Sequence, residues 1–275
     1  MKRRLVWSVP AFLGLAVVAA CGSSGTSGPS PSPATSSSVS GGTSTQATLQ
    51  HVPRGEATLT LAGNKLTVAI TLTGLAPNSR HPVHIHGMGN CSSNSPVIYP
   101  LENVVANATG TANVTSTVDG VASIPASGWY VNVHNGPALT PPYQFSPIAC
   151  GEVKGGSNEV TVPLQQGSGL SQAASGTAAL SLANGQLTVK ITMSGLAPNS
   201  VHAAHIHVGS CTNQGAVVHP LTNVTADGNG NATSSTTVAG VTSIPSGQWY
   251  VNVHGSTNLN TQTGFDPIAC GSLTP

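Results

Sequence analysis

An internal repeat constrains the fold of this chain more than any other feature. The phrase Tyr-Val-Asn-Val-His occurs at residues 130–134 and 250–254, and each copy precedes a Cys-Gly, at 150–151 and 270–271. Each copy also follows a His-x-His pair, at 84–86 and 205–207. The offset between copies is 121 residues at the His pairs and 120 from the next cysteine onward. Such a constant offset predicts two copies of one domain in tandem.

Each copy has the sequence pattern of short β-strands. Residues 57–61 and 66–72 alternate apolar and polar side chains on either side of a Gly-Asn turn, which predicts a hairpin. Residues 178–182 and 187–193 repeat it around Asn-Gly. No helical periodicity follows residue 20. Short strands separated by frequent turn signals predict an all-β chain of two Greek-key β-sandwich or barrel domains.

The linkers follow from composition. The first domain is expected at residues 47–164, with residues 159–164 either an extra edge strand or part of the linker. Residues 165–175 are rich in Gly, Ser and Gln and are expected to be the linker, and residues 176–275 the second domain. Residues 21–46 are almost free of large apolar side chains and predict a disordered Ser/Gly/Pro tether.

The amino terminus resembles a bacterial lipoprotein signal. Three basic residues at 2–4 precede a mostly apolar run that ends in Val-Ala-Ala-Cys21. The alternatives are an ordinary signal peptide or a membrane span, but the run is short for a span and contains Ser8 and Pro10. We therefore expect a signal peptide at residues 1–20, lipidation of Cys21, and an extracytoplasmic protein anchored to the bacterial cell membrane.

Charge and cysteine content narrow the function classes. Only 5% of residues are charged, against about 25% in an ordinary domain, and the net charge is +1. This composition does not support a nucleic-acid partner. Four cysteines lie in the repeats, and an exported chain favours disulfides between them. Repeat symmetry selects the pairs Cys91–Cys150 and Cys211–Cys270. The alternative, in which the cysteines bind zinc as thiolates, is disfavoured because the chain contains nothing like a Cys-x-x-Cys motif.

The histidines suggest a metal site in each copy. Residues i and i+2 of a strand project from the same face, so a His-x-His pair can share one ion, and a histidine on a neighbouring strand can complete the set. Three neutral imidazoles suit copper or zinc. The alternative is that they are ordinary polar residues, but ten histidines are unusual in a chain with so few charged groups. The expected ligands are His84, His86, His134, His205, His207 and His254.

These motifs, in this order, resemble the copper/zinc superoxide dismutase family. The second copy reads His205-Ile-His207-Val-Gly-Ser-Cys211, Asn223-Val-Thr-Ala-Asp-Gly228, Tyr250-Val-Asn-Val-His254 and Ile268-Ala-Cys-Gly271. The Ala-His-Ile-His and Tyr-Val-Asn-Val-His phrases also resemble the CHRD (chordin-type) domain. The resemblance covers both repeats. It implies copper on the six histidines, the two disulfides, and a dismutase-like Greek-key fold.

The chain departs from the dismutase pattern at three places. The position of the family's bridging histidine is Val97 in one copy and Val217 in the other. The zinc loop is absent. The arginine that normally attracts superoxide is replaced by Pro147 and Pro267. We therefore expect a lipid-anchored copper-binding protein, with zinc as the alternative ion. Two further hypotheses are a copper-only dismutase that converts superoxide to oxygen and hydrogen peroxide, and a structural CHRD interaction module without metal.

Other polar residues near the motifs have separate interpretations. His219 is either a fourth ligand of the second set or a solvated loop histidine, and we favour the second. His81 and His202 lie three residues before a ligand, and are expected to be packing or surface residues. Asn132 and Asn252 are expected to bond a neighbouring loop.

Overall fold

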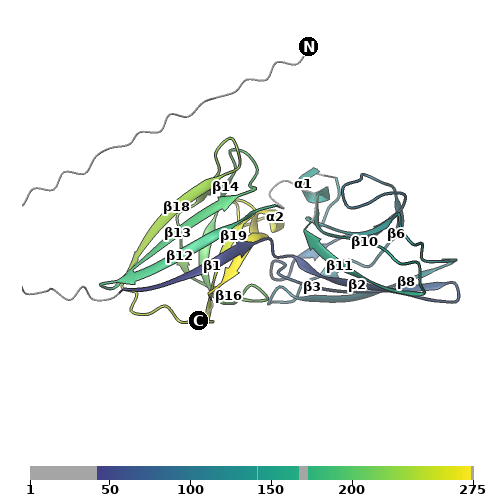
Figure 1. Ribbon diagram of the computed structural model, residues 1–275, viewed down its shortest axis with the longest axis horizontal. Coiled ribbons are helices and arrows are strands. Elements are labelled where there is room, and N and C mark those ends of the chain that lie inside the picture. The colour runs from purple at the N-terminus through teal and green to yellow at the C-terminus, as the bar shows by residue number, and fades with distance from the viewer. Residues whose placement is uncertain (1–41, 141, 167–172, 274–275) are drawn as a thin grey trace, which may run out of the picture. The chain divides into compact units, whose positions relative to one another are not determined.

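The computed structural model describes residues 42–140, 142–166 and 173–273, which belong to one compact unit of the chain (Figure 1). The expected signal peptide, the expected lipidation site Cys21 and most of the expected tether lie outside the described residues. Within the described ranges, no helix is both long enough and apolar enough to cross a membrane.

The first domain is built almost entirely of antiparallel strands. Its main sheet has the order β6-β5-β9-β10-β11-β2-β3-β8, and β4 pairs with β7 beside it. The elements are β2 (Arg54–Ala62), β3 (Lys65–Thr73), β4 (Arg80–His81), β5 (Val83–His86), β6 (Val97–Pro100), β7 (Val104–Val105), β8 (Ala112–Asp119), β9 (Trp129–His134), α1 (Pro142–Phe145), β10 (Pro147–Val153) and β11 (Glu159–Gln166).

The second domain repeats this arrangement. Its main sheet has the order β16-β15-β19-β20-β1-β12-β13-β18, and β14 pairs with β17. The elements are β1 (Thr43–Gln50), β12 (Ser175–Ala183), β13 (Gln186–Ser194), β14 (Val201–His202), β15 (Ala204–Ser210), β16 (Asn213–Pro220), β17 (Val224–Thr225), β18 (Ala232–Ala239), β19 (Trp249–His254), α2 (Gln262–Phe265) and β20 (Pro267–Ser272).

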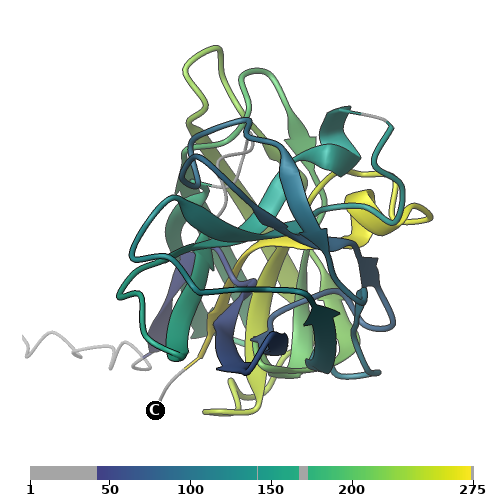
Figure 2. The same cartoon turned by 90° about the vertical axis from the view of Figure 1, so that its right-hand side faces the viewer.

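Alternating side chains give each domain one apolar core. In the first domain, every second residue of β2 and β3 is buried, and these residues pack with Val83 and Ile85 of β5 and Val131 and Val133 of β9. Both ends of the sheet therefore share a core, and Figure 2 shows the strands wrapped around it rather than lying in one flat layer. A second cluster fills the other domain in the same way. The all-β fold with two tandem domains is confirmed.

The first strand of each copy lies in the sheet of the other copy. Strand β1 pairs with β12 and β20 of the second domain, and β11 pairs with β10 and β2 of the first (Figure 1). The two strands occupy the same place, since Leu49 is in register with Gly176 and Leu164 with the equivalent Gly55. The two copies have therefore exchanged equivalent strands.

The connection between β1 and β2 is only three residues long, His51 to Pro53. Its middle residue, Val52, is 2% exposed and packs with Tyr250, Cys211 and Cys270 of the second domain. A connection this short that contains a proline favours an extended path over a tight hairpin. Such an extended connection directs β1 away from β2 and so favours strand exchange. The exchanged strands therefore link the two domains through backbone pairing.

Two glutamines of the second domain also bond to the backbone of the first. The Gln214 side chain donates to the carbonyl of Leu75 at 2.9 Å. The Gln262 amide donates to the carbonyl of Arg80 at 2.9 Å and accepts from the Arg80 N–H at 2.9 Å. These bonds supplement the exchanged strands.

The structure differs from the sequence-based expectation in three details. Residues 47–50, expected in the first domain, pair in the second sheet, and their strand already begins at Thr43, inside the expected tether. Residues 159–164 form neither an edge strand nor a linker, because β11 lies inside the sheet between β10 and β2. The two four-residue helices were not expected, since one helical turn is too short to produce a periodic pattern.

Candidate metal centre

Each domain brings three histidines together on one face of neighbouring strands. His84 and His86 project from β5, and His134 ends the adjacent β9. One nitrogen from each ring lies within 4.8 Å of the others, and β15 and β19 form the same cluster in the second domain. The structure thus assembles the six expected ligands into the two expected sets: His84, His86 and His134; His205, His207 and His254.

Backbone carbonyls fix the orientation of the buried rings. In the second domain, Nδ1 of His207 donates to the carbonyl of Gly215 at 3.0 Å, and Nδ1 of His254 donates to that of Phe265 at 2.6 Å. Because a neutral imidazole has one N–H, each Nε2 then carries a free lone pair. Neither Nε2 has a hydrogen-bond partner although both are buried. The same holds for Nδ1 of His205, so three nitrogens without partners converge.

The first domain uses the equivalent contacts. Nδ1 of His86 donates to the carbonyl of Ser95 at 2.8 Å, and Nδ1 of His134 donates to that of Phe145. Nε2 of His86 is buried without a partner, and Nε2 of His134 lies 3.1 Å from Nδ1 of His84. In both domains, the convergent atoms are therefore Nδ1 of the first histidine and Nε2 of the other two.

Burial lowers the pKa of five of the six rings and so favours their neutral form. The pKa values of His84 and His254 are lowered to about 4, mainly by burial and to a smaller extent by the neighbouring histidines. Burial also lowers the pKa of His134, His205 and His207. Neutral imidazole is the form that binds metal, so protons do not compete strongly for these nitrogens.

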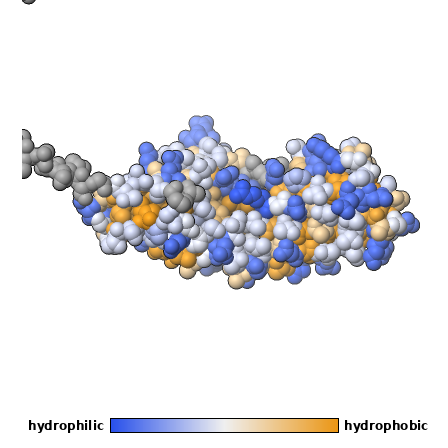
Figure 3. Space-filling model, turned by 60° about the horizontal axis from the view of Figure 1, so that its bottom comes forward, coloured by the Kyte–Doolittle hydropathy of each residue, from blue (hydrophilic) through white to orange (hydrophobic). Residues whose placement is uncertain are grey.

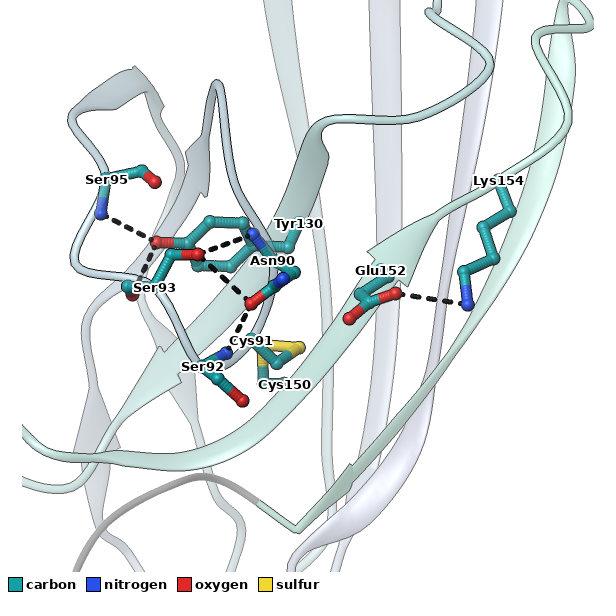
Figure 4. Close-up of a disulfide and its surroundings, with 9 residues drawn as sticks. All are labelled: Asn90, Cys91, Ser92, Ser93, Ser95, Tyr130, Cys150, Glu152 and Lys154. Carbon is teal, nitrogen blue, oxygen red and sulfur yellow. Dashed lines mark hydrogen bonds and ion pairs between the residues drawn. A yellow bond between two sulfur atoms is a disulfide. The ribbon is translucent and has the colours of Figure 1, made fainter.

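A disulfide secures the loop that orients one ligand. Cys91 and Cys150 are bonded, as are Cys211 and Cys270, which confirms both expected pairs. Figure 4 shows the Cys91–Cys150 bridge tying the loop after β5 to β10. Next to it, the Tyr130 hydroxyl donates to the carbonyl of Ser93 and accepts from the N–H of Ser95. The bridge and the tyrosine thus hold the residue whose carbonyl orients His86.

Tyrosines and asparagines of β9 and β19 lie on the same face as the clustered histidines, a placement that was not predicted from the sequence. The ring of Tyr130 stacks on His86 at 4.8 Å, and that of Tyr250 on His207 at 4.9 Å. Asn132 is in register with His84, and its buried Oδ1 has no hydrogen-bond partner. Their alternation with the core residues of Tyr-Val-Asn-Val-His was the signal for this placement.

His81 and His202 hydrogen-bond to the backbone at the ends of β9 and β19. Both are buried, and Nδ1 of each donates to the carbonyl of the last residue of the neighbouring strand, His134 or His254, at 2.9 Å. Nε2 of His81 lies 2.7 Å from the hydroxyl of Ser79. Burial lowers the pKa of His81 to about 4. These two histidines are packing residues that fix the backbone of the third ligand.

His219 is not brought to the second cluster. Its ring meets that of Trp249 edge-on, with centroids 5.3 Å apart, and it is in register with the core residue Ile206. Tyr99 packs on Trp129 in the same way in the first domain. The structure thus places His219 on the opposite face of its sheet from the histidine cluster.

The donor set fits a copper or zinc ion. Metal–nitrogen bonds to histidine are about 2.0–2.1 Å long, so nitrogens sharing one ion lie no more than about 4 Å apart. The observed limit of 4.8 Å therefore requires only small ring movements. Buried nitrogens without partners are uncommon in folded proteins, and a shared ion would satisfy them.

The sequence profile of the CHRD domain matches residues 34–137 and 153–260, more than half of the chain. A search of the curated proteins finds no match. Each matched segment includes the strand that lies in the sheet of the other copy, β1 or β11. The chain therefore belongs to the CHRD domain family and contains two of these domains in tandem.

Proposed function

We propose that this protein binds one copper ion in each of its two CHRD domains. The observation that carries the proposal is the convergence of three histidine nitrogens in each domain, with Nε2 of His86, His207 and His254 buried without hydrogen-bond partners. Bound copper would supply a centre that can exchange single electrons. The resemblance to copper/zinc superoxide dismutases favours copper over zinc at these sites.

The protein's own contribution is to present the ligands in one protonation state and orientation. The carbonyls of Phe145 and Phe265, at the ends of α1 and α2, keep the proton on Nδ1 of the third histidine. Such contacts behind metal ligands raise ligand basicity and fix the tautomer, and their loss typically weakens binding 10- to 100-fold. Both short helices therefore have a direct role in the proposed sites.

Copper titration of the full chain against a competing chelator tests the proposal. We expect two equivalents for the wild type and one for His205→Ala/His207→Ala, because that variant removes two of three ligands from one site. His84→Ala/His86→Ala should likewise leave one. His219→Ala is the matched control, since this histidine lies outside the clusters, and it should retain two.

Unchanged stoichiometry in His205→Ala/His207→Ala would refute copper binding at the second site. If the full chain bound no copper at all, the structural hypothesis, a CHRD interaction module without metal, would be favoured. Tighter binding of zinc than copper in the same competition would identify zinc as the occupant instead.

A copper-only superoxide dismutase is the second candidate. His84 and His205 are only partly buried, whereas the other four ligands are buried, so each cluster has an accessible side. Electrostatic attraction of superoxide should be weak, because Pro267 stands at the position of the family's arginine and charged residues are few. On the face in Figure 3, hydrophobic residues form several separate patches among hydrophilic ones. Dismutase activity of the copper-loaded chain no higher than that of free copper would exclude this candidate.

We also propose that the chain is exported and anchored to the bacterial cell membrane through a lipid on Cys21. The lipoprotein-like signal carries this proposal. Replacement of Cys21 by Ser should release the protein from the membrane fraction of the producing bacterium. Retention of this variant in the membrane fraction would contradict the proposal.

A further inference from the structure

One asparagine in each copy has a buried side-chain oxygen without a partner on the face that carries the histidines. Asn132 in β9 is 7% exposed, and Asn252 in β19 is 1% exposed. In both residues Oδ1 is buried and has no hydrogen-bond partner. Most buried polar atoms in folded proteins are hydrogen-bonded, so two exceptions at equivalent positions call for an explanation.

The strand register places each asparagine beside a clustered histidine. Asn132 is directly opposite His84, and Asn252 is directly opposite His205. Directly opposite residues of antiparallel strands project from the same face, with Cβ atoms about 4.5–5.5 Å apart. Each asparagine also stands two residues before the third histidine of its cluster, on the same face of that strand. Each amide therefore borders a cluster of three convergent nitrogens.

The other neighbours across the strands leave this oxygen without a partner. On the side away from the histidine, Asn132 is opposite Cys150 and Asn252 is opposite Cys270, and both cysteines are in disulfides. The remaining cross-strand neighbour of the first histidine in each cluster is a proline, Pro100 or Pro220. The asparagine is thus the only polar side chain in register with that histidine.

The chemistry of the amide oxygen indicates what it does beside the cluster. The oxygen carries partial negative charge and only accepts hydrogen bonds, as do the lone pairs of the three nitrogens. A cation satisfies nitrogens and oxygen together. Carbonyl oxygens suit harder ions, whereas soft sulfur ligands select Cu(I). Because the Coulomb attraction of the oxygen grows with the charge of the ion, this neighbour stabilises Cu(II) more than Cu(I).

We propose that Asn132 and Asn252 determine the oxidation-state preference of the copper sites, their amide oxygens stabilising Cu(II) relative to Cu(I). This inference rests on the proposed copper binding and adds a residue that tunes the ion to the carbonyls that orient the rings. The adjacent tyrosine of the first domain does not share the role, because the Tyr130 hydroxyl is already bonded to Ser93 and Ser95.

Affinities for Cu(II) and Cu(I) in a chain with one remaining site test the proposal. The variant His84→Ala/His86→Ala keeps only the second cluster, so each titration of the full chain against a chelator reports one site. In this background, Asn252→Leu keeps the branched shape of the side chain but removes the oxygen. It should weaken Cu(II) binding at least about tenfold and Cu(I) binding much less. A tenfold change in the ratio of the two dissociation constants raises the reduction potential by about 59 mV, which voltammetry measures independently.

Three further variants complete the test. Asn252→Asp in the same background keeps an oxygen and adds negative charge, so it should shift the ratio towards Cu(II), and it serves if the leucine variant does not fold. Asn132→Leu combined with His205→Ala/His207→Ala repeats the measurement on the first cluster and should give the same direction. Asn113→Leu, at an exposed position of β8, is the matched control and should leave both affinities unchanged.

The outcomes separate this inference from the proposed function. If His84→Ala/His86→Ala bound copper in neither oxidation state, the proposed function would fail at this site and the inference with it. If the background bound copper but Asn252→Leu weakened Cu(II) and Cu(I) equally, the asparagine would have a structural role only, and the inference alone would be overturned. A ratio unchanged in both Asn252→Leu and Asn252→Asp would overturn it as well.

Discussion

Replacing Leu49 by Ala should destabilise the second domain, although Leu49 comes directly before the strands of the first. Leu49 lies in β1, is 0% exposed and belongs to the core of the second domain. Truncating a buried leucine to alanine costs about 2–5 kcal/mol, depending on how far the cavity collapses. A loss of about 3 kcal/mol would raise the local opening equilibrium of the affected strands roughly a hundredfold.

Hydrogen exchange followed by peptide mass spectrometry distinguishes which sheet is affected. In Leu49→Ala, amides of β12 and β20 should exchange faster, because β1 pairs with both strands. Amides of β2, the next strand in the sequence, should change much less, because β2 pairs with β11 and β3. The control Thr48→Ala alters an exposed residue of the same strand and should leave all these rates close to those of the wild type.

The opposite pattern would refute the strand exchange. If Leu49→Ala increased exchange in β2 and β10 and left β12 unaffected, β1 would be folding back onto its own copy. The reciprocal variant Leu164→Ala gives an independent check, because Leu164 is fully buried in the core of the first domain. It should increase exchange in β2 and β10 rather than in β12.

Two further predictions concern pH and chain fragments. Asp266, in the turn before β20, is 5% exposed, and neither of its carboxyl oxygens has a hydrogen-bond partner. Asp266→Ser should raise the free energy of unfolding by about 1–3 kcal/mol at pH 7, because it removes this unpaired buried carboxyl group. Burial raises the pKa of Asp266 well above 3.8, so the unfolded state loses this proton first, and the destabilisation is present above pH 3.8. The gain should therefore shrink as pH falls towards 4 in denaturant titrations of both proteins. A gain independent of pH would contradict this reasoning. A fragment of residues 54–166 contains every strand of the first sheet and should fold as a monomer. A fragment of residues 173–275 lacks β1, so size-exclusion chromatography should show it aggregated or unfolded. A folded, monomeric second fragment would contradict the requirement for β1.

The histidine clusters could be predicted because their signal is local. On a strand, His-x-His places two rings on one face whatever the rest of the fold does. The third ligand needed long-range information, which the repeated Tyr-Val-Asn-Val-His phrase supplied. The disulfides followed from repeat symmetry in the same way. By contrast, the carbonyls of Phe145 and Phe265 that orient the third ligands come from four-residue helices, which have no periodicity to detect.

The strand exchange could not be predicted, because alternation determines which face of a strand is buried but not which copy it pairs with. Residues 57–61 read Ala-Thr-Leu-Thr-Leu and residues 178–182 read Ala-Ala-Leu-Ser-Leu, so β1 meets nearly the same apolar pattern in either sheet. The choice depends on the connections around the strands, which differ in length. Residues 51–53 join β1 to β2, whereas residues 167–174 join β11 to β12.

The exchange also links the two histidine clusters to strands from the other copy. In the second domain, Gln50 of β1 is in register with Cys270 of β20, and β20 pairs with β19, which ends in the cluster residue His254. In the first domain, β11 pairs with Cys150 of β10, next to the strand that carries His134. Each disulfide that secures a cluster is thus flanked by a strand of the other copy. A tandem chain keeps that strand at a high effective concentration, so both clusters can depend on the exchange without requiring a second molecule.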